Sequence, residues 1–359
     1  HAPTHPGGRR RPSSSPGSLR QRVADYSVGT KRMLIVPVCG EDQSPAECAA
    51  VFNVMQVANS YGGSVVDYLH GVVGFANEWL AESSYGQFQL DATVTSPLHV
   101  KGYTYASCGD FASKTVGWTS WAPQAGALDV LAYAQAEAEL GIARAGFDFA
   151  AIFIAKCTDL PFSGRGWVGI PGFAMNSPPN DMDPSFIHEL GHNLGLNHGA
   201  RLKAGSQGRA IWETGFIETN TPSPTGGLAE YGASFTPMGR GLTPDGHFAL
   251  PAKIVLEWVA DADTVQIPLG AACAPCGPYL LQPADTGVRG TGPLGLRIAT
   301  PISSRYFWVE HRTKISAGSA AVVASAAYQP DSGDGGVVSK AVMADKIVDA
   351  VDSTFDAYI

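Results

Sequence analysis

Apolar residues in the first half of the chain follow two different spacings. The segments 31–39 ("KRMLIVPVC") and 147–157 ("FDFAAIFIAKC") are short, nearly continuous apolar runs, which are typical of strands buried on both faces. Residues 88–94 ("FQLDATV") alternate between apolar and polar positions, as a half-buried strand does. Residues 64–84 and 127–142 instead place their apolar side chains at helical spacing, and the second segment has a glycine near its end.

The order of these elements predicts the fold class. Strand, helix, strand, helix and strand in succession favour a mixed α/β layer, in which helices pack on a twisted, mostly parallel sheet. The final segment, 339–359, has a pattern that predicts a terminal amphipathic helix. After about residue 261, short strand candidates separated by Gly and Pro predict a mostly β part, so the whole chain is expected to be α+β: "VQIPLG", "YLLQP", "LGLRIAT" and "RYFWVEHR".

We expect three parts along the chain. Residues 1–24 are rich in Pro, Ser, Gly and Arg, which favours a disordered tail or the remnant of a propeptide. Residues 25–260 would form the main domain, and residues 261–359 a β-rich C-terminal region. With 45% apolar and 16% charged residues in 359, the chain is expected to be a packed globular protein.

Charge and hydropathy exclude some partners. The formal net charge of −8 argues against nucleic acid or an anionic membrane as the main partner. No apolar run reaches the roughly 18 residues that a membrane-spanning helix needs, so no membrane span is expected.

The six cysteines indicate an oxidising compartment. An even number in a chain rich in Gly and Pro favours an extracellular protein with up to three disulfides, the alternative being buried or free thiols. Cys273 and Cys276 form a Cys-x-x-Cys without a second such pair, which favours a disulfide over a structural zinc site. The sequence leaves open which cysteines pair.

The segment "FIHELGHNLGLNHG", residues 186–199, holds the candidate chemistry. In a helix, His188 and His192 lie about 40° apart around the axis and about 6 Å apart along it, so both rings can reach one ion. Glu189 lies beside them and can reach a water on that ion without being a ligand itself. This is the position that a general base needs.

A third histidine predicts the shape of the backbone. In an uninterrupted helix His198 would lie about 15 Å from His188 and could not share the ion. The chain must therefore turn after His192, and Gly195 suits that turn because glycine adopts left-handed backbone angles at little steric cost. Three neutral imidazoles leave Zn²⁺ an open fourth position for water, so the segment predicts one catalytic zinc ion held by His188, His192 and His198.

Other interpretations of the motif remain. A bare His-Glu-x-x-His occurs by chance on helices, although the full pattern fixes five positions at once. A structural zinc site would keep the metal without the enzyme, but such sites usually have four protein ligands and often cysteine. A glutamate could serve as the third ligand instead, the candidates being Glu213, Glu218 and Glu230. The remaining histidines are isolated and are expected to be surface or hydrogen-bonded residues: His1, His5, His70, His99, His247 and His311.

The eleven-residue pattern His-Glu-x-x-His-x-x-Gly-x-x-His resembles that of the metzincin zinc endopeptidases, in which a methionine turn follows downstream. Here Met238 comes forty residues after His198, in "SFTPMGRG". Within the metzincins the chain is most similar to the gametolysin family of cell-wall lytic enzymes, through "YGASFTPMG", "HFALPAKIVLEWV" and "YFWVEHR". The resemblance covers about residues 30–312. Ala233 departs from it, because related sequences more often have a polar residue there.

The resemblance implies a metzincin-like zincin fold with a long active-site helix and with Met238 as a hydrophobic floor beneath the histidines. It also implies a secreted endopeptidase, made as a zymogen, whose substrates are extended polypeptides such as hydroxyproline- or Pro-rich extracellular glycoproteins. An edge strand within residues 147–172 is expected to bind the peptide, with "GWVGIPG" either at the lip of the cleft or as a structural loop. Two alternatives stay open: a non-catalytic matrix or adhesion protein on a protease-like fold, and a zinc amidase or deacetylase.

Overall fold

The computed structural model places most of the chain between residues 26 and 349. The described residues are 26–58, 63–112, 114–116, 118–119, 122–123, 126–176, 182–204, 226–229, 236–239, 246–268, 279–299, 305–316, 319–328, 342–343 and 348–349. Several predictions lie outside them: the tail 1–24, the pair Cys273 and Cys276, the alternative ligands Glu213, Glu218 and Glu230, and Ala233.

The first sheet contains six described strands: β1 (Gly29–Gly40), β2 (Phe88–Val94), β3 (Leu98–Val100), β6 (Phe149–Ile154), β7 (Gly164–Gly166) and β8 (Phe173–Met175). Their order is β2-β1-β6-β8-β7, and β3 pairs with the end of β1. All pairs are parallel except β7 with β8, so the sheet has one antiparallel edge. The predicted mostly parallel sheet is confirmed.

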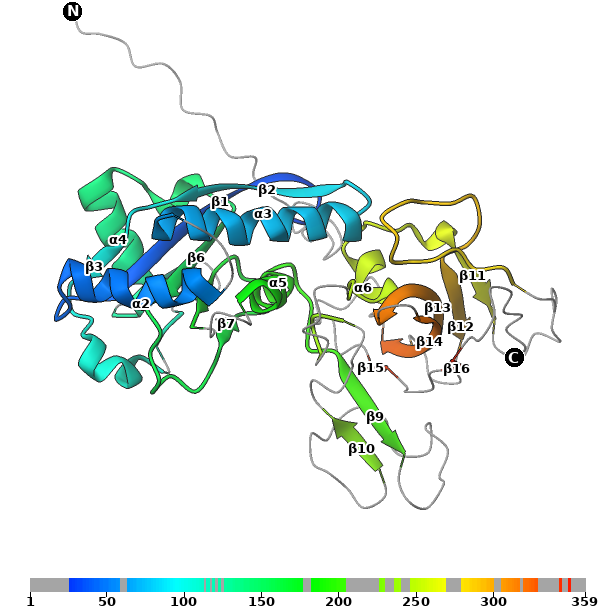
Figure 1. The fold of residues 1–359 in the computed structure, drawn as a ribbon. Coiled ribbons are helices and arrows are strands. Elements are labelled where there is room, and N and C mark those ends of the chain that lie inside the picture. Colours follow the sequence, from blue (N-terminus) through cyan, green and yellow to red (C-terminus); the bar gives the residue numbers. More distant parts are fainter. Residues whose placement is uncertain are drawn as a thin grey trace, which may run out of the picture.

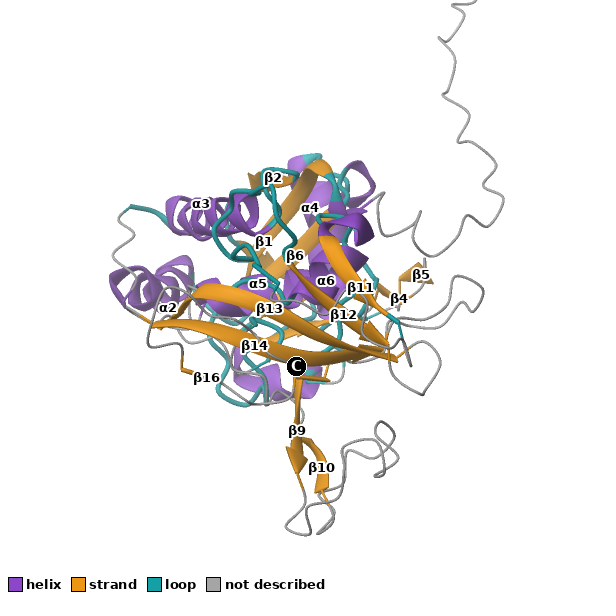
Figure 2. Ribbon diagram, turned by 90° about the vertical axis from the view of Figure 1, so that its right-hand side faces the viewer, coloured by secondary structure: helices purple, strands orange, loops and turns teal. Residues whose placement is uncertain are grey.

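Helices cover both faces of this sheet (Figures 1 and 2). Because successive strand residues point to opposite faces, Met33 and Ile35 of β1 join one apolar core, and Leu34 and Val36 join another. The first core packs under α2, α3 and α5, and the second packs against α4 and a 3₁₀ helix. The helices are α2 (Pro45–Ala58), α3 (Val65–Ser83), α4 (Leu128–Leu140), α5 (Met182–Asn193) and α6 (Leu250–Val255), with 3₁₀ turns at Tyr105–Phe111, Arg144–Gly146 and Asp261–Asp263.

Local signals set the ends of two predicted helices. At the start of α3, the Ser64 hydroxyl accepts a hydrogen bond from the Asp67 amide (3.2 Å), and the Asp67 carboxylate accepts one from the Ser64 amide (2.8 Å). Gly141 ends α4 in the left-handed conformation with φ +70°. The helices predicted at 64–84 and 127–142 are thus confirmed, whereas α2 was not predicted.

Two disulfides join elements of the first sheet to their surroundings. Cys39–Cys48 links the end of β1 to α2, and Cys108–Cys157 links the 3₁₀ helix Tyr105–Phe111 to the chain after β6. Four of the six cysteines are therefore oxidised, as predicted, and the pairing that the sequence left open is settled for them.

A second sheet contains eight described strands: β9 (Ala200–Ala204), β10 (Gly226–Ala229), β11 (Thr264–Ile267), β12 (Gly295–Ala299), β13 (Arg305–Ser316), β14 (Ser319–Tyr328), β15 (Val342–Met343) and β16 (Val348–Asp349). Its order is β10-β9-β15-β14-β13-β12-β11, with β16 also on β14, and β13 and β14 form a long antiparallel hairpin. A two-stranded ribbon, β4 (Trp118–Thr119) with β5 (Ala122–Pro123), completes the strands.

Two expectations for the C-terminal part are wrong. "YLLQP" is irregular chain with one isolated bridge, between Pro283 and His311, and not a strand. The terminal segment does not form a helix at its described positions. Instead, β15 and β16 pair with β14, and β15 also pairs with β9, so distant strand pairing overrides the local helical pattern.

The second sheet and the helical layer share an apolar core. Phe248 and Trp258, which flank α6, are fully buried in the same cluster as the residues under α3 and α5. The Trp258 indole donates to the Ser27 carbonyl (2.6 Å), and the Trp79 indole donates to the Gly246 carbonyl (3.0 Å). On its other side α6 packs with Leu294 and Trp308 of the second sheet region.

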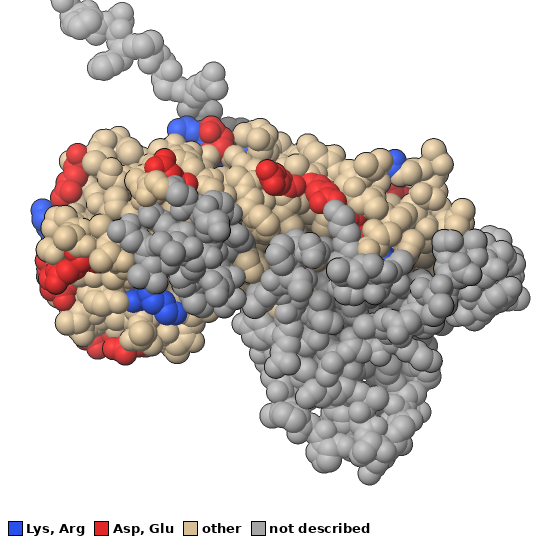
Figure 3. Space-filling view, viewed as in Figure 1, with Lys and Arg blue, Asp and Glu red and all other residues tan. Residues whose placement is uncertain are grey.

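The described surface carries no broad charged region on the face seen in Figure 3, where acidic and basic side chains are scattered among neutral ones. Among the helices that the structure describes, none combines the length and the apolar character that crossing a membrane requires.

Candidate metal centre

Helix α5 carries two of the candidate ligands on a buried framework. Phe186 and Leu190 belong to the core beneath the first sheet, which fixes that face of the helix. His188 and His192 are 7% and 6% exposed, so both imidazoles are largely removed from water. The helix ends at Asn193, before the predicted turn.

The turn at Gly195 has the geometry that the motif predicts. Gly195 has φ +98°, its amide donates to the His192 carbonyl (2.8 Å), and the Leu196 amide donates to the Gly191 carbonyl (2.9 Å). These two bonds form a Schellman motif, which closes a helix at a left-handed residue. The chain then runs back toward α5, and His198 returns to the other two histidines.

The three imidazoles form a compact group, called here the histidine cluster (His188, His192 and His198). Their candidate ligand atoms all lie within 4.8 Å of one another, and the Nε2 atoms of His192 and His198 are 3.0 Å apart. The structure therefore confirms a buried three-histidine group able to bind a metal ion, without showing which metal.

Backbone carbonyls orient two of the rings. His188 Nδ1 lies 2.6 Å from the Pro237 carbonyl oxygen, and His192 Nδ1 lies 2.8 Å from the Leu196 carbonyl oxygen. Because a carbonyl only accepts, each Nδ1 carries the proton and each Nε2 carries the lone pair that a metal needs. Leu196 thus has two roles, because its amide helps to close the turn and its carbonyl orients the imidazole of His192.

Burial keeps these imidazoles neutral. It lowers the pKa of His188 to about 4, and it lowers the pKa of His192 to about 3, where the neighbouring imidazoles add to the effect. Neutral imidazole is the form that coordinates metal, so the site is in its ligating form at neutral pH. The free Nε2 lone pairs of these two imidazoles, with a nitrogen of His198 close by, suit a cation.

Glu189 lies against the edge strand β7. Its carboxylate is buried, which raises the pKa of Glu189 to about 8, while a hydrogen bond from the Gly166 amide opposes that rise. A Cβ at Gly164 would lie 2.5 Å from Glu189 Oε1, and one at Gly166 would lie 3.0 Å from Oε2. The carboxylate therefore occupies space that only glycine leaves open on this strand.

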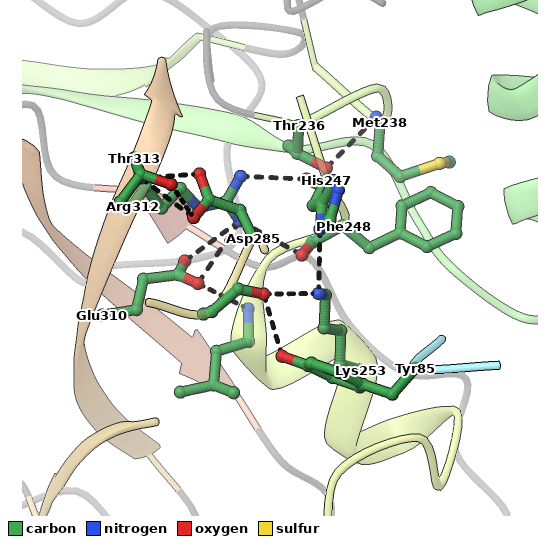
Figure 4. Close-up of polar contacts among 12 residues, drawn as sticks. Tyr85, Thr236, Met238, His247, Phe248, Lys253, Asp285, Glu310, Arg312 and Thr313 are labelled. Carbon is green, nitrogen blue, oxygen red and sulfur yellow. Dashed lines mark hydrogen bonds and ion pairs between the residues drawn. The ribbon is translucent and has the colours of Figure 1, made fainter. Parts of the chain in front are cut away.

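Met238 and Phe248 form the floor of the centre beneath α5. A Cβ at Gly191 would lie 2.4 Å from the Met238 sulfur and 3.1 Å from the Phe248 ring, so both side chains pack directly on the helix backbone between the ligands. Figure 4 shows the two side chains next to each other. The Gly199 amide also donates to the Met238 carbonyl (2.6 Å), which ties the methionine turn to the segment after His198.

The loop after β7 holds the end of α5 in place. The Gly169 amide donates to the His192 carbonyl (2.8 Å), and the Asn193 side-chain amide donates to the Gly172 carbonyl (3.1 Å). Trp167 is 38% exposed, and its indole donates to the Val116 carbonyl (3.3 Å). The segment "GWVGIPG" therefore lies beside the centre. Asn193, Phe248 and the glycines of β7 were not assigned from the sequence, because their partners are distant along the chain.

The other described histidines do not join this cluster. His247 is buried and hydrogen-bonded, with its Nδ1 3.2 Å from the Lys253 ammonium. His99 lies near Cys39 and Cys48, but those two sulfurs are joined in a disulfide. Comparisons of the sequence with protein-family models and with curated proteins find no match, so the functional argument rests on the residues and their geometry.

Proposed function

We propose that this protein is a secreted zinc-dependent endopeptidase. The observation that carries the proposal is the combination of three converging imidazoles with a buried carboxylate, Glu189, on the helix that holds two of them. Catalytic zinc sites usually have three protein ligands and leave one position for water, whereas structural sites are closed by a fourth ligand.

The donor set fits zinc. His188, His192 and His198 offer only imidazole nitrogen as ligand atoms, which suits Zn²⁺ better than the oxygen-seeking Ca²⁺ or Mg²⁺. When bound, zinc would supply Lewis-acid polarisation of a substrate carbonyl and lower the pKa of water. Peptide hydrolysis also moves a proton from the attacking water to the nitrogen of the leaving amine, and a group of the protein must carry that proton.

Glu189 is placed to move that proton. Its carboxylate is held on β7 by the Gly166 amide, beside the ligand helix, and burial makes it a stronger base than an exposed glutamate. As general base it would accept a proton from the attacking water. As general acid it would return the proton to the leaving amine.

Strand β7 offers a docking edge for an extended peptide. It is the last strand of the first sheet in the described residues, and it runs antiparallel to β8. A substrate that pairs with its outer edge by strand addition would pass directly by Glu189. The two disulfides support secretion, because disulfides persist in oxidising compartments. The resemblance to gametolysins supports extracellular, Pro- or hydroxyproline-rich glycoproteins as substrates.

Metal analysis and casein digestion test the proposal together. The purified protein should hold one zinc per chain, digest casein, and lose the digestion when a chelator removes the metal. Glu189→Ala should keep the zinc and lose about 10²–10⁴-fold in rate, while Glu137→Gln, at an exposed position on α4, should leave the rate unchanged.

The outcomes separate the alternatives. Digestion that survives Glu189→Ala would overturn the mechanism. Bound zinc without hydrolysis of any peptide or small amide would favour the matrix or adhesion protein. Release of acetate from N-acetylated small substrates, with intact casein, would favour a zinc amidase or deacetylase.

A further inference from the structure

Strand β13 carries a buried ion pair close to the candidate centre. Glu310 and Arg312 are two residues apart, so their side chains leave the same face of the sheet, and they are 0% and 1% exposed. The Arg312 guanidinium lies 3.3 Å from the Glu310 carboxylate (Figure 4). Removing two charges from water costs free energy, which further hydrogen bonds must offset. The groups that make those hydrogen bonds to Glu310 and Arg312 are therefore the groups that the pair holds in place.

Those partners are backbone groups of the segment 247–250. The two terminal nitrogens of Arg312 donate to the carbonyls of His247 (3.0 Å) and Phe248 (3.1 Å). The Glu310 carboxylate accepts a hydrogen bond from the Leu250 amide (3.1 Å), at the first turn of α6. Residues 246–249 have no regular secondary structure, so β13 supplies hydrogen bonds that a helix or sheet would otherwise provide.

The segment places Phe248 under the ligand helix. Phe248 is fully buried and packs edge-on against Trp79, with ring centroids 4.9 Å apart. Its ring edge also lies close to Gly191, the residue directly before His192 in α5. A shift of the Phe248 backbone would therefore be passed to the helix turn that carries both ligands.

We infer that Arg312 and Glu310 are positioning residues of the metal centre. They act through the segment 247–250 and Phe248 on helix α5, and the C-terminal sheet is accordingly part of the catalytic unit. The inference rests on the proposed function for the identity of the metal, and it adds that residues more than a hundred positions after the motif set the metal's affinity.

Zinc affinity and cobalt spectroscopy test this inference on the full chain. Arg312→Lys keeps the charge but loses the two-pronged donation, and Glu310→Gln keeps the shape but loses the charge. Both should remain folded by circular dichroism and bind zinc about ten-fold more weakly in competition with a chelator, at the low end of what outer partners of a metal site contribute. With Co²⁺ in place of zinc, the visible absorption bands should shift.

Two controls separate positioning from general stability. Thr313→Val alters the same strand and removes a hydrogen bond to Asp285 (3.1 Å), which lies outside the segment 247–250. Leu294→Ala opens a cavity in the core of the second sheet region, where Leu294 is 3% exposed. Both controls should keep the wild-type zinc affinity and cobalt spectrum at temperatures where they are folded.

The results divide clearly. Folded Arg312→Lys and Glu310→Gln with wild-type zinc affinity and an unshifted cobalt spectrum would overturn the inference and leave the proposed zinc peptidase function untouched. If both variants fail to fold, Phe248→Leu tests the same path with the ion pair intact, and unchanged zinc affinity there overturns it. A wild-type protein that binds no zinc defeats the proposed function itself.

Discussion

Two buried polar clusters meet at Phe248, and they differ in how charge and hydrogen bonding are balanced. The histidine cluster brings like groups together, since candidate ligand nitrogens of three imidazoles lie within 4.8 Å of one another. The second cluster, called here the Arg312 cluster (Arg312, Glu310, Lys253 and His247), pairs donors with acceptors. Lys253 donates to the Ala284 carbonyl (2.6 Å) and to His247, and Arg312 contacts a carboxylate and two carbonyls.

This difference distinguishes a cluster that can bind a ligand from a cluster that supports the fold. A cluster that brings several ring nitrogens to one point suits a cation, whereas in the Arg312 cluster the named donors already meet acceptors of the protein. Burial alone does not distinguish the two, because His188, His192 and His247 are all buried and burial lowers the pKa of all three. The direction in which the ring nitrogens are bonded does distinguish them.

The largest expected effect comes from removing a ligand. His198→Ala should lower zinc affinity by more than the ~100-fold that an outer partner is worth, and it should abolish casein hydrolysis. Metal content after dialysis measures the first effect. Full zinc retention would show that His198 is not a ligand. His70→Ala, on the exposed side of α3, is the matched control and should retain zinc.

Removing the Arg312 cation altogether should lower stability in addition to metal affinity. Arg312→Met leaves Glu310 buried without its cation and should lower the free energy of unfolding by about 3–5 kcal/mol, measured by urea denaturation. Replacing both partners, as Arg312→Met with Glu310→Leu, should recover part of that loss. If the single variant is as stable as the wild type, the pair is not a buried support and the contrast between the clusters fails.

A smaller effect should follow from moving Glu189 without changing it. A Cβ at Gly164 would overlap the Glu189 carboxylate, so Gly164→Ala should displace the base and lower kcat by about 10²-fold while zinc stays bound. Gly172→Ala is the control on the same side of the centre, since its Cβ would meet only the Ala150 carbonyl, at 3.9 Å. Equal rates for both variants would show that Glu189 does not need its place on β7.

The smallest effect concerns pH. In the unfolded chain the imidazoles of His188 and His192 take up protons near pH 6.5, but in the fold their pKa values are about 4 and about 3. Below pH 6.5 the unfolded state binds more protons at these two rings, so their contribution to the stability of the metal-free protein should fall with the pH, by at most about 1.4 kcal/mol per imidazole per pH unit. Glu189, whose pKa is raised to about 8, contributes in the opposite direction, so the series is measured in the Glu189→Gln variant. Urea denaturation between pH 7 and pH 5 measures the contribution of the rings. A flat profile would mean that the rings take up protons over the same pH range in the folded and unfolded states, and the same series with His192→Gln added should be shallower.

Much of the helical layer was predictable because its signals are local. The periodicity of α3 lies within that helix, and the glycine that ends α4 directly follows it. The alternation in β2 reflects which face of that strand is buried. Helix α2 also had a signal that periodicity missed, since Ser44 and Glu47 exchange capping hydrogen bonds at its start. The terminal helix prediction failed because β15 and β16 are stabilised by partners far along the chain.

The same division applies to the candidate site. The three histidines and the turn at Gly195 were predictable because eleven residues contain them, and the φ of Gly195 bears this out. The hydrogen bond from Gly166 to Glu189 and the donation from Arg312 to Phe248 join residues that no local pattern connects. Only the fold places these residues beside the motif.

The Schellman turn after α5 fixes two positions relative to His192. The carbonyl that orients the His192 ring belongs to Leu196, and the candidate ligand His198 follows two residues later, so one short stretch places both. One extra residue after Gly195 would misplace the orienting oxygen and the third ligand in a single step. The length of this stretch is therefore as constrained as the identity of its residues, and insertions here should disrupt the site.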